Sequence, residues 1–202
     1  MSITKYIPNT ITCFNLASGC FATIMALQGD LKAAIIWIII AAIFDFSDGL
    51  AARLLKAYSP LGKELDSLSD IVSFGVAPGM SLYVLLATAV GSSEISGISW
   101  LPYLAFAIPV FSGLRLAKFN VDERQSTSFI GMPVPAHALL WGSLSYVLQP
   151  FITNHALYIL IACLIASMAT SYLLVSEVPM FSMKVKSLKW KGNELRYILF
   201  VC

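Results

Sequence analysis

Long apolar stretches, separated by short polar breaks, make up most of this chain of 202 residues. A helix needs about 20 apolar residues to cross the hydrocarbon core of a membrane, and stretches of that length recur along the chain. The pattern predicts an all-α protein, a polytopic bundle of six transmembrane helices. Their expected ranges are 10–28, 33–55, 64–90, 100–118, 133–149 and 154–176.

Composition supports the assignment to the membrane class. Hydrophobic residues make up 58% of the chain and charged residues 12%, whereas soluble domains are roughly 25% charged. The polar breaks leave no room for a separate soluble domain, so residues 1–202 are expected to form one membrane domain with a basic tail over 177–202. The net charge of +2 gives no indication of a nucleic-acid partner.

The positions of lysine and arginine predict the orientation, because basic residues in short loops favour the cytoplasmic side. With a cytoplasmic N-terminus, Lys32 alone of the 13 basic residues falls on the opposite side. The others form four cytoplasmic groups, namely Lys5; Arg53, Lys56 and Lys63; Arg115, Lys118 and Arg124; and Lys184, Lys186, Lys189, Lys191 and Arg196. We therefore expect both termini in the cytoplasm and an even number of spans.

Four aspartates stand inside two predicted spans, where an ionised carboxylate costs roughly 2.5 to 3.5 kcal/mol at the helix centre. Asp45 and Asp48 approach the cytoplasmic end of the second span, and Asp66 and Asp70 begin the third, which runs back. Spacings of three and four residues place each pair on one face of its helix. We expect all four carboxylates at a similar depth in the same leaflet.

Carboxylates that face one another repel, and a bound cation relieves this repulsion. Hard oxygen ligands suit Mg²⁺, Mn²⁺ or Ca²⁺, and Mg²⁺ often joins a few carboxylates to substrate phosphates. We predict a metal site made by the four aspartates, with two divalent ions to match their charge. Arg53 could hold a phosphate or orient an aspartate, or it could be an interfacial arginine. Small residues beside the aspartates leave space for a ligand or allow close helix packing.

A transporter is the alternative from another functional class, because ion-coupled transport also uses carboxylates within the membrane. Transporters tend to spread charged groups over broken helices near the midplane. Here the aspartates cluster beside a loop that carries Arg53, Lys56 and Lys63. That position favours an enzyme at which a soluble polar substrate meets a lipid substrate, and it leaves a small ion-coupled transporter as the alternative.

Two segments carry a recognisable signature. Residues 45–53 read DFSDGLAAR and, after eight further residues, 62–70 read GKELDSLSD. Together they resemble the signature of the CDP-alcohol phosphotransferases, DxxDGxxARx(8)GxxxDxxxD, at all eight defined positions. The segments IPN at 7–9, SDIVSFGVAP at 69–78, LRLAKFN at 114–120 and FIGMPVPA at 129–136 resemble the CDP-diacylglycerol–serine O-phosphatidyltransferases of that family.

The resemblance implies a six-helix core, usually a homodimer among membrane lipids. CDP-diacylglycerol would enter from the bilayer and L-serine from the cytosol, and the products would be phosphatidylserine and CMP. It also implies roles for individual residues: metal binding by Asp45, Asp48, Asp66 and Asp70, a general base in Asp70, and contact with the CDP group by Gly49, Ala52, Arg53 and Gly62. Asn9, Thr12 and Asn15 could touch the cytidine or diphosphate, and helix-start or packing roles are equally open.

The serine zwitterion needs a cation to hold its carboxylate. Arg115 is the candidate, because a guanidinium grips carboxylates in a bidentate fashion, and Lys118 and Asn120 are close by in the sequence. The positive-inside pattern would also place basic residues here. Glycerol phosphate or inositol phosphate are alternative acceptors that would call for a denser basic pocket. His137, where the family pattern has a small residue, is expected to be packed and neutral.

Overall fold

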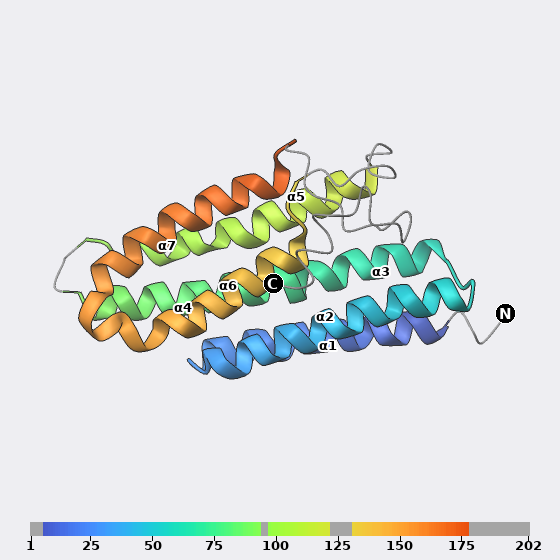
Figure 1. The fold of residues 1–202 in the computed structure, drawn as a ribbon, viewed down its shortest axis with the longest axis horizontal. Coiled ribbons are helices and arrows are strands. Elements are labelled where there is room, and N and C mark those ends of the chain that lie inside the picture. The colour runs from blue at the N-terminus through green and yellow to red at the C-terminus, as the bar shows by residue number, and fades with distance from the viewer. Residues whose placement is uncertain (1–5, 94–96, 122–130, 178–202) are drawn as a thin grey trace, which may run out of the picture.

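The computed structural model describes residues 6–93, 97–121 and 131–177, which form long helices and contain no strand. The expectation of an all-α fold is therefore confirmed for these residues (Figure 1). The α-helices are α1 (Tyr6–Leu27), α2 (Leu31–Leu54), α3 (Pro60–Asp70), α4 (Ala77–Gly91), α5 (Ala107–Val121), α6 (Val134–Leu148) and α7 (Ile152–Val175). A π-helix, η2 (Ile71–Val76), and two 3-10 helices, η3 (Leu101–Phe106) and η5 (Gln149–Phe151), connect some of them. Lys5, Arg124 and the tail from 178 lie outside the described residues.

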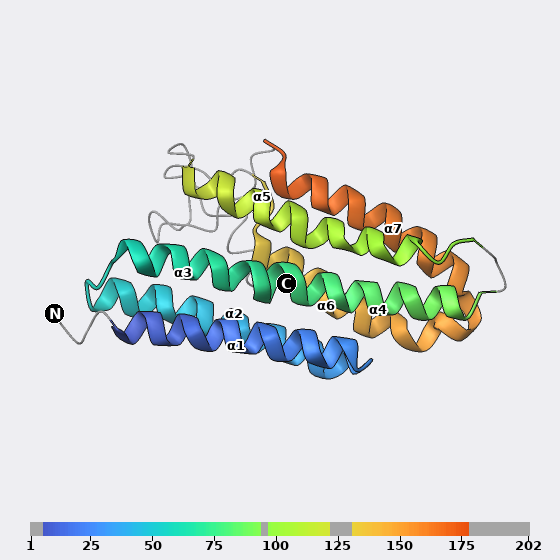
Figure 2. The same cartoon turned by 180° about the vertical axis from the view of Figure 1, so that it is seen from behind.

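Five helical segments among the described residues are long and apolar enough to cross a membrane: Tyr6–Leu27, Leu31–Leu54, Pro60–Gly91, Leu101–Val121 and Val134–Val175. The last has 42 residues, and a straight helix of that length would extend about 63 Å, twice the hydrocarbon core of about 30 Å. The chain instead reverses direction at η5, as Figures 1 and 2 show. The sixth span and the cytoplasmic position of both termini stay predictions.

The third predicted span is one continuous helical rod built from α3, η2 and α4. Ser59 begins it, because its side chain accepts a hydrogen bond from the Gly62 amide at 3.0 Å and Pro60 occupies the first turn. Directly after Asp70 the rod changes to the wider π-helical winding of η2. Insertions of this kind occur frequently at functional sites.

Small residues let this rod pack closely against its neighbours. A Cβ on Gly19 of α1 would lie 2.7 Å from the Ser73 Cα, and a Cβ on Gly79 would lie 2.8 Å from the Pro109 Cδ of α5. Two hydroxyls add hydrogen bonds to α1, because Ser69 donates to the Thr12 carbonyl at 3.2 Å and Ser73 donates to the Asn15 carbonyl at 3.0 Å. The helices that carry the site residues are therefore held in a fixed register.

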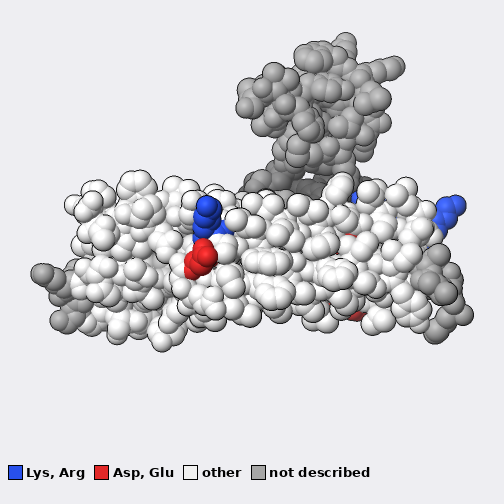
Figure 3. Space-filling model, turned by 90° about the horizontal axis from the view of Figure 1, so that it is seen from below, with Lys and Arg blue, Asp and Glu red and all other residues white. Residues whose placement is uncertain are grey.

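The outer surface of the bundle is mostly apolar. Figure 3 shows one long face on which charged side chains are few. The start of α1, the connection between α2 and α3, and the end of α5 share one end of the bundle in both ribbon views (Figures 1 and 2). The signature residues are carried by helices that meet at this end.

Candidate active site

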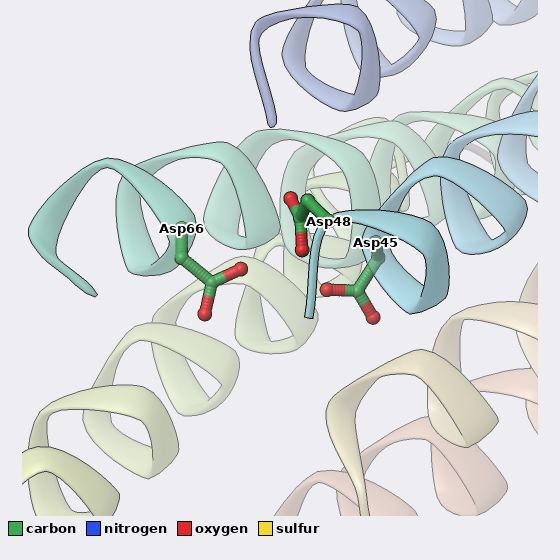
Figure 4. Close-up of side chains that lie close together, drawn as sticks. All are labelled: Asp45, Asp48 and Asp66. Atoms are coloured by element: carbon green, nitrogen blue, oxygen red, sulfur yellow. The ribbon is translucent and has the colours of Figure 1, made fainter. Parts of the chain in front are cut away.

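Three carboxylates from two helices meet between α2 and α3. Asp45 and Asp48 project from the last turns of α2 and Asp66 projects from α3, with one ligand oxygen of each within 4.8 Å of the others. Figure 4 shows the three side chains directed toward a common space. Asp48 is only 6% exposed, and the other two are half-buried. The structure thus brings together three of the four aspartates that the sequence singled out.

Asp70 lies one turn beyond Asp66 and does not belong to this close group of three. Its side chain is buried, and its Oδ1 accepts a hydrogen bond of 3.2 Å from the Asn15 amide of α1. It still interacts electrostatically with Asp45, Asp66 and Asp48. All four carboxyl groups therefore lie within electrostatic reach of one another.

Among the described residues, one fully buried carboxylate oxygen has no hydrogen-bond partner. Asp48 Oδ2 is fully buried and unpaired, although a buried polar atom left without a partner is costly. A divalent cation would satisfy this oxygen and offset the repulsion among the neighbouring carboxylates. Carboxylate oxygens are the ligands that Mg²⁺, Mn²⁺ and Ca²⁺ take. The residues present therefore fit a divalent metal.

A cavity of about 560 Å³ opens beside these carboxylates, within the size range of small-molecule sites. Asp48 and Asp66 form part of its wall. The other lining residues are Pro8, Asn9, Thr12, Gly49, Ala52, Arg53, Ala57, Tyr58, Ser59, Gly62, Lys63 and Phe119. Six of the seven residues suggested from the sequence to contact the CDP group thus line one cavity, together with two of the aspartates, whereas Asn15 does not line it.

Local backbone features shape the cavity wall. A Cβ on Gly49 would meet nothing nearer than the Arg53 Nη2 at 4.0 Å, whereas one on Gly62 would lie 2.9 Å from the Asn9 Oδ1. Arg53 folds back along α2, and its Nε donates to the Gly49 carbonyl at 2.9 Å. Lys56, with φ of 49° in the left-handed region, turns the chain from α2 toward α3. The two glycines have no side chain that would fill the cavity, and Arg53 supplies positive charge to its wall.

A model of a known family matches this chain from residue 5 to residue 180, under the description CDP-alcohol phosphatidyltransferase. The chain belongs to the CDP-alcohol phosphatidyltransferase family. The family model covers most of the chain, so the agreement extends well beyond the signature segments at 45–53 and 62–70.

Curated relatives in this family carry related names. The chain is 38% identical over 174 residues to the CDP-diacylglycerol–serine O-phosphatidyltransferase of Bacillus subtilis, covering 86% of this chain and 89% of that protein. It is 37% identical over 191 residues to the protein of the same name from Mycobacterium leprae, covering 91% and 60% respectively. An archaetidylserine synthase of Methanothermobacter thermautotrophicus is 34% identical over 142 residues, covering 68% and 57%. The chain spans less than two thirds of the latter two proteins.

Outside the family signature, the three residues suggested for serine binding all lie on α5 but make different contacts. Arg115 is 3% exposed, its Nε donates to the Met132 carbonyl at 3.5 Å, and its guanidinium carbon lies 5.6 Å from the Phe119 ring centroid. Lys118 Nζ lies 3.4 Å from the Val175 carbonyl and 3.5 Å from Glu177.

Asn120 instead contacts α3, where its amide donates to the Ser67 hydroxyl at 2.8 Å. Among the described residues, none of these three α5 side chains lines the cavity beside the aspartates. Phe119, which Arg115 approaches, does line it. Serine binding by the three residues stays a prediction.

Sequence reasoning did not select several residues of the cavity wall. Tyr58 and Ser59 fall in the variable spacer of the family signature, and Phe119 falls within the LRLAKFN segment. Lys63 was considered for topology and as part of the basic loop beside the aspartates but not as a site residue, yet it lines the cavity and donates to the Asn120 carbonyl at 3.3 Å. For Tyr58 and Ser59, proximity to the signature was the available signal, since helical periodicity does not show which loop residues turn inward. Lys63 and Phe119 lie on α3 and α5, and periodicity does not show which helices pack beside each other.

His137 is packed away from the aspartates. It is fully buried in α6, and its Nε2 lies 3.1 Å from the Thr170 hydroxyl, to which the Trp141 indole also donates, at 3.0 Å. The expected packing of His137 is what the structure contains, and this polar cluster joins α6 to α7.

Proposed function

We propose that this protein transfers the phosphatidyl group of CDP-diacylglycerol to the hydroxyl of L-serine, giving phosphatidylserine and CMP. Family membership and the names of the curated relatives support this reaction. The observation that carries the proposal is the cavity in which the signature residues and two aspartates meet. The group to be transferred would be held there beside the carboxylate cluster.

The CDP moiety would occupy this cavity. Gly49, Ala52 and Gly62 leave room for the diphosphate against the backbone, and Arg53 offers donors that match phosphate oxygens. Asn9 and Thr12 of α1, which also line the cavity, would contact the nucleotide as well. This placement puts the diphosphate beside Asp48 and Asp66.

Divalent ions would be held by Asp45, Asp48, Asp66 and Asp70, and two ions would balance the four carboxylates. Mg²⁺ and Mn²⁺ are the first candidates, and Ca²⁺ is a further one. All three ions accept oxygen ligands. When bound, such ions neutralise the charge that grows on the departing CMP. The unpaired Asp48 Oδ2 supports a ligand role for this residue.

The reaction would proceed by attack of the serine hydroxyl oxygen on the phosphorus that bears the diacylglycerol. A new phosphorus–oxygen bond forms, and the bond from that phosphorus to the bridging oxygen breaks. CMP leaves with the electron pair. Asp70 would accept the hydroxyl proton as general base, and its burial beside the other carboxylates supports the assignment.

Serine would be bound on the α5 side of the site, with Arg115 holding its carboxylate and with Lys118 and Asn120 as further contacts. The buried Arg115 guanidinium lies beside Phe119, a residue of the cavity wall. The names of the relatives favour serine over glycerol phosphate or inositol phosphate. The assay described below tests those two acceptors as well.

The proposal includes a membrane arrangement. Residues 1–202 would form one domain with six spans, both termini in the cytoplasm and the active site facing the cytoplasm, as a homodimer. The basic residues Arg53, Lys56 and Lys63 lie near the connection between α2 and α3, at the same end of the bundle as the start of α1 (Figures 1 and 2). Basic residues in short loops favour the cytoplasmic side of a membrane, and this supports the proposed orientation.

The test is CMP release by the purified protein in detergent or lipid. CDP-diacylglycerol is supplied with serine, glycerol phosphate or inositol phosphate, each with Mg²⁺, Mn²⁺ or Ca²⁺. We expect CMP and phosphatidylserine with serine and a divalent ion. Absence of CMP under every combination would overturn the enzyme assignment and would favour the alternative, an ion-coupled transporter. CMP with glycerol phosphate alone would overturn the acceptor.

A further inference from the structure

Asn15 of α1 is fully buried, yet it lies outside the cavity wall. Its amide nitrogen donates to Asp70 Oδ1 at 3.2 Å. We infer that Asn15 is a positioning residue for Asp70, which fixes the Asp70 carboxylate so that its other oxygen serves the reaction. This inference rests on the proposed function, because it assigns Asn15 a role through the proposed base and metal ligand.

The geometry of a carboxylate makes such a partner useful. Rotation about the last side-chain bond of an aspartate is broad and roughly two-fold, so burial alone does not decide which oxygen faces which neighbour. Donation by Asn15 selects Oδ1 and leaves Oδ2 to accept a proton or a ligand. Groups that support ligand residues in this way commonly matter nearly as much as the ligands themselves.

Asn15 is itself held firmly. Its backbone carbonyl accepts a hydrogen bond of 3.0 Å from Ser73, in the π-helical turn that follows Asp70. One helical turn later, Gly19 packs so closely that a Cβ there would lie 2.7 Å from the Ser73 Cα. On the other side of the Asn15–Asp70 hydrogen bond, Ser69 donates to the Thr12 carbonyl at 3.2 Å, so the two segments are held in register on both sides of that bond.

Simple packing does not account for the choice of asparagine. The Asn15 Oδ1 is buried without a hydrogen-bond partner among the described residues, which is an unfavourable state for an amide. An aliphatic side chain of similar size would avoid that cost. Polar residues also stabilise the packing of membrane helices through interhelical hydrogen bonds. The experiment must therefore separate stabilisation of the α1–α3 contact from positioning of Asp70.

The variants Asn15→Leu, which removes the amide at similar size, and Asn15→Asp, which sets an acceptor against Asp70, provide the test. Ser18→Ala is the matched control, because Ser18 is buried on the same helix and donates only within α1, to the Phe14 carbonyl. The measurements are kcat and KM for CDP-diacylglycerol, Mn²⁺ affinity by electron paramagnetic resonance without substrates, and thermal stability in EDTA.

We expect both Asn15 variants to lower kcat or Mn²⁺ affinity by about 10- to 100-fold, with KM for CDP-diacylglycerol nearly unchanged. Ser18→Ala should leave these values unchanged. A rise in KM with kcat intact would overturn the inference and place Asn15 at the nucleotide. Loss of thermal stability with unchanged kcat and Mn²⁺ affinity would also overturn the inference, because Asn15 would then only hold α1 against α3. Asn15→Gln, which keeps the amide, should recover part of the loss and serves if the other variants do not fold.

A double-variant cycle on Mn²⁺ affinity tests whether Asn15 acts through Asp70. In the Asp70→Asn background, Asn15→Leu should cause no further loss of Mn²⁺ affinity. An additional loss as large as that in the wild-type background would overturn the inference. Because Mn²⁺ binding is measured without turnover, this cycle tests the coupling between Asn15 and Asp70 even if wild-type protein releases no CMP.

Discussion

Gly62 of α3 faces Asn9 of α1 so closely that a Cβ on Gly62 would lie 2.9 Å from the Asn9 Oδ1. Both residues line the cavity proposed for the CDP group. A methyl group at this position would displace Asn9 and occupy space beside the position proposed for the diphosphate.

We expect Gly62→Ala to raise KM for CDP-diacylglycerol about tenfold, because overpacking typically costs about 1 to 3 kcal/mol and 1.4 kcal/mol corresponds to a factor of ten. Steady-state CMP release measures the effect. Gly91→Ala is the control, since a Cβ on Gly91 would meet no atom within 4 Å. Equal KM values for the two variants would contradict a nucleotide at Gly62.

Asp48→Asn should separate the charge of the cluster from its packing. The substitution keeps size but removes one negative charge from a group whose ligand oxygens lie within 4.8 Å. In EDTA the variant should melt at a higher temperature than wild type, because repulsion is relieved. With Mn²⁺ present the order should reverse, since a bound ligand stabilises the fold by about 2.7 kcal/mol at 100 times its Kd.

Thermal melting with and without Mn²⁺ checks this reversal. Asp30→Asn is the control, because Asp30 caps the start of α2 away from the cluster and accepts from Ala33. A variant that gains as much stability from Mn²⁺ as wild type does would remove Asp48 from the metal ligands.

Asp70→Asn should abolish detectable turnover while leaving CDP-diacylglycerol binding largely intact, because Asp70 does not line the nucleotide cavity. Loss of a general base alone typically lowers rates by about 10² to 10⁴, and loss of a metal ligand would add to this. Single-turnover CMP release and equilibrium nucleotide binding are the two measurements. Unchanged turnover would remove Asp70 from the role of base.

Arg115→Lys should raise KM for serine at least about tenfold with little change in KM for CDP-diacylglycerol, because lysine cannot reproduce bidentate binding of a carboxylate. Lys118→Met is the informative comparison. Lys118 already contacts the Val175 carbonyl and Glu177, so its substitution should affect serine less. An Arg115 variant with an unaltered serine KM would place the acceptor elsewhere.

The sequence predicted the parts of the site that depend on helical spacing within one segment. Asp45 and Asp48 share a face of α2, and their meeting with Asp66 follows once α2 and α3 run in opposite directions. The signature also predicted part of the cavity wall, because Gly49, Ala52 and Arg53 belong to it and line the cavity.

Contacts between distant segments were beyond such reasoning. The bond from Asn15 to Asp70 joins residues 55 positions apart, and no periodicity within α1 points to its partner. Lys118 and Asn120, two residues apart on α5, contact the end of α7 and the middle of α3 respectively, and neither contact follows from the spacing along α5. The π-helix of Ile71–Val76 was missed as well, because its apolar sequence also suits an ordinary α-helix.

That π-helix sets the rotational phase between two halves of one rod. Because a π-helical turn holds one residue more than an α-helical turn, the residues after it point about 100° away from where an uninterrupted α-helix of the same sequence would place them. The face with Asp66 and Asp70 and the face with Gly79, which packs on Pro109, are thus aimed independently. If the same residues of Ile71–Val76 wound as an ordinary α-helix, the carboxylates would keep their place but the packing surface of α4 would turn away from α5.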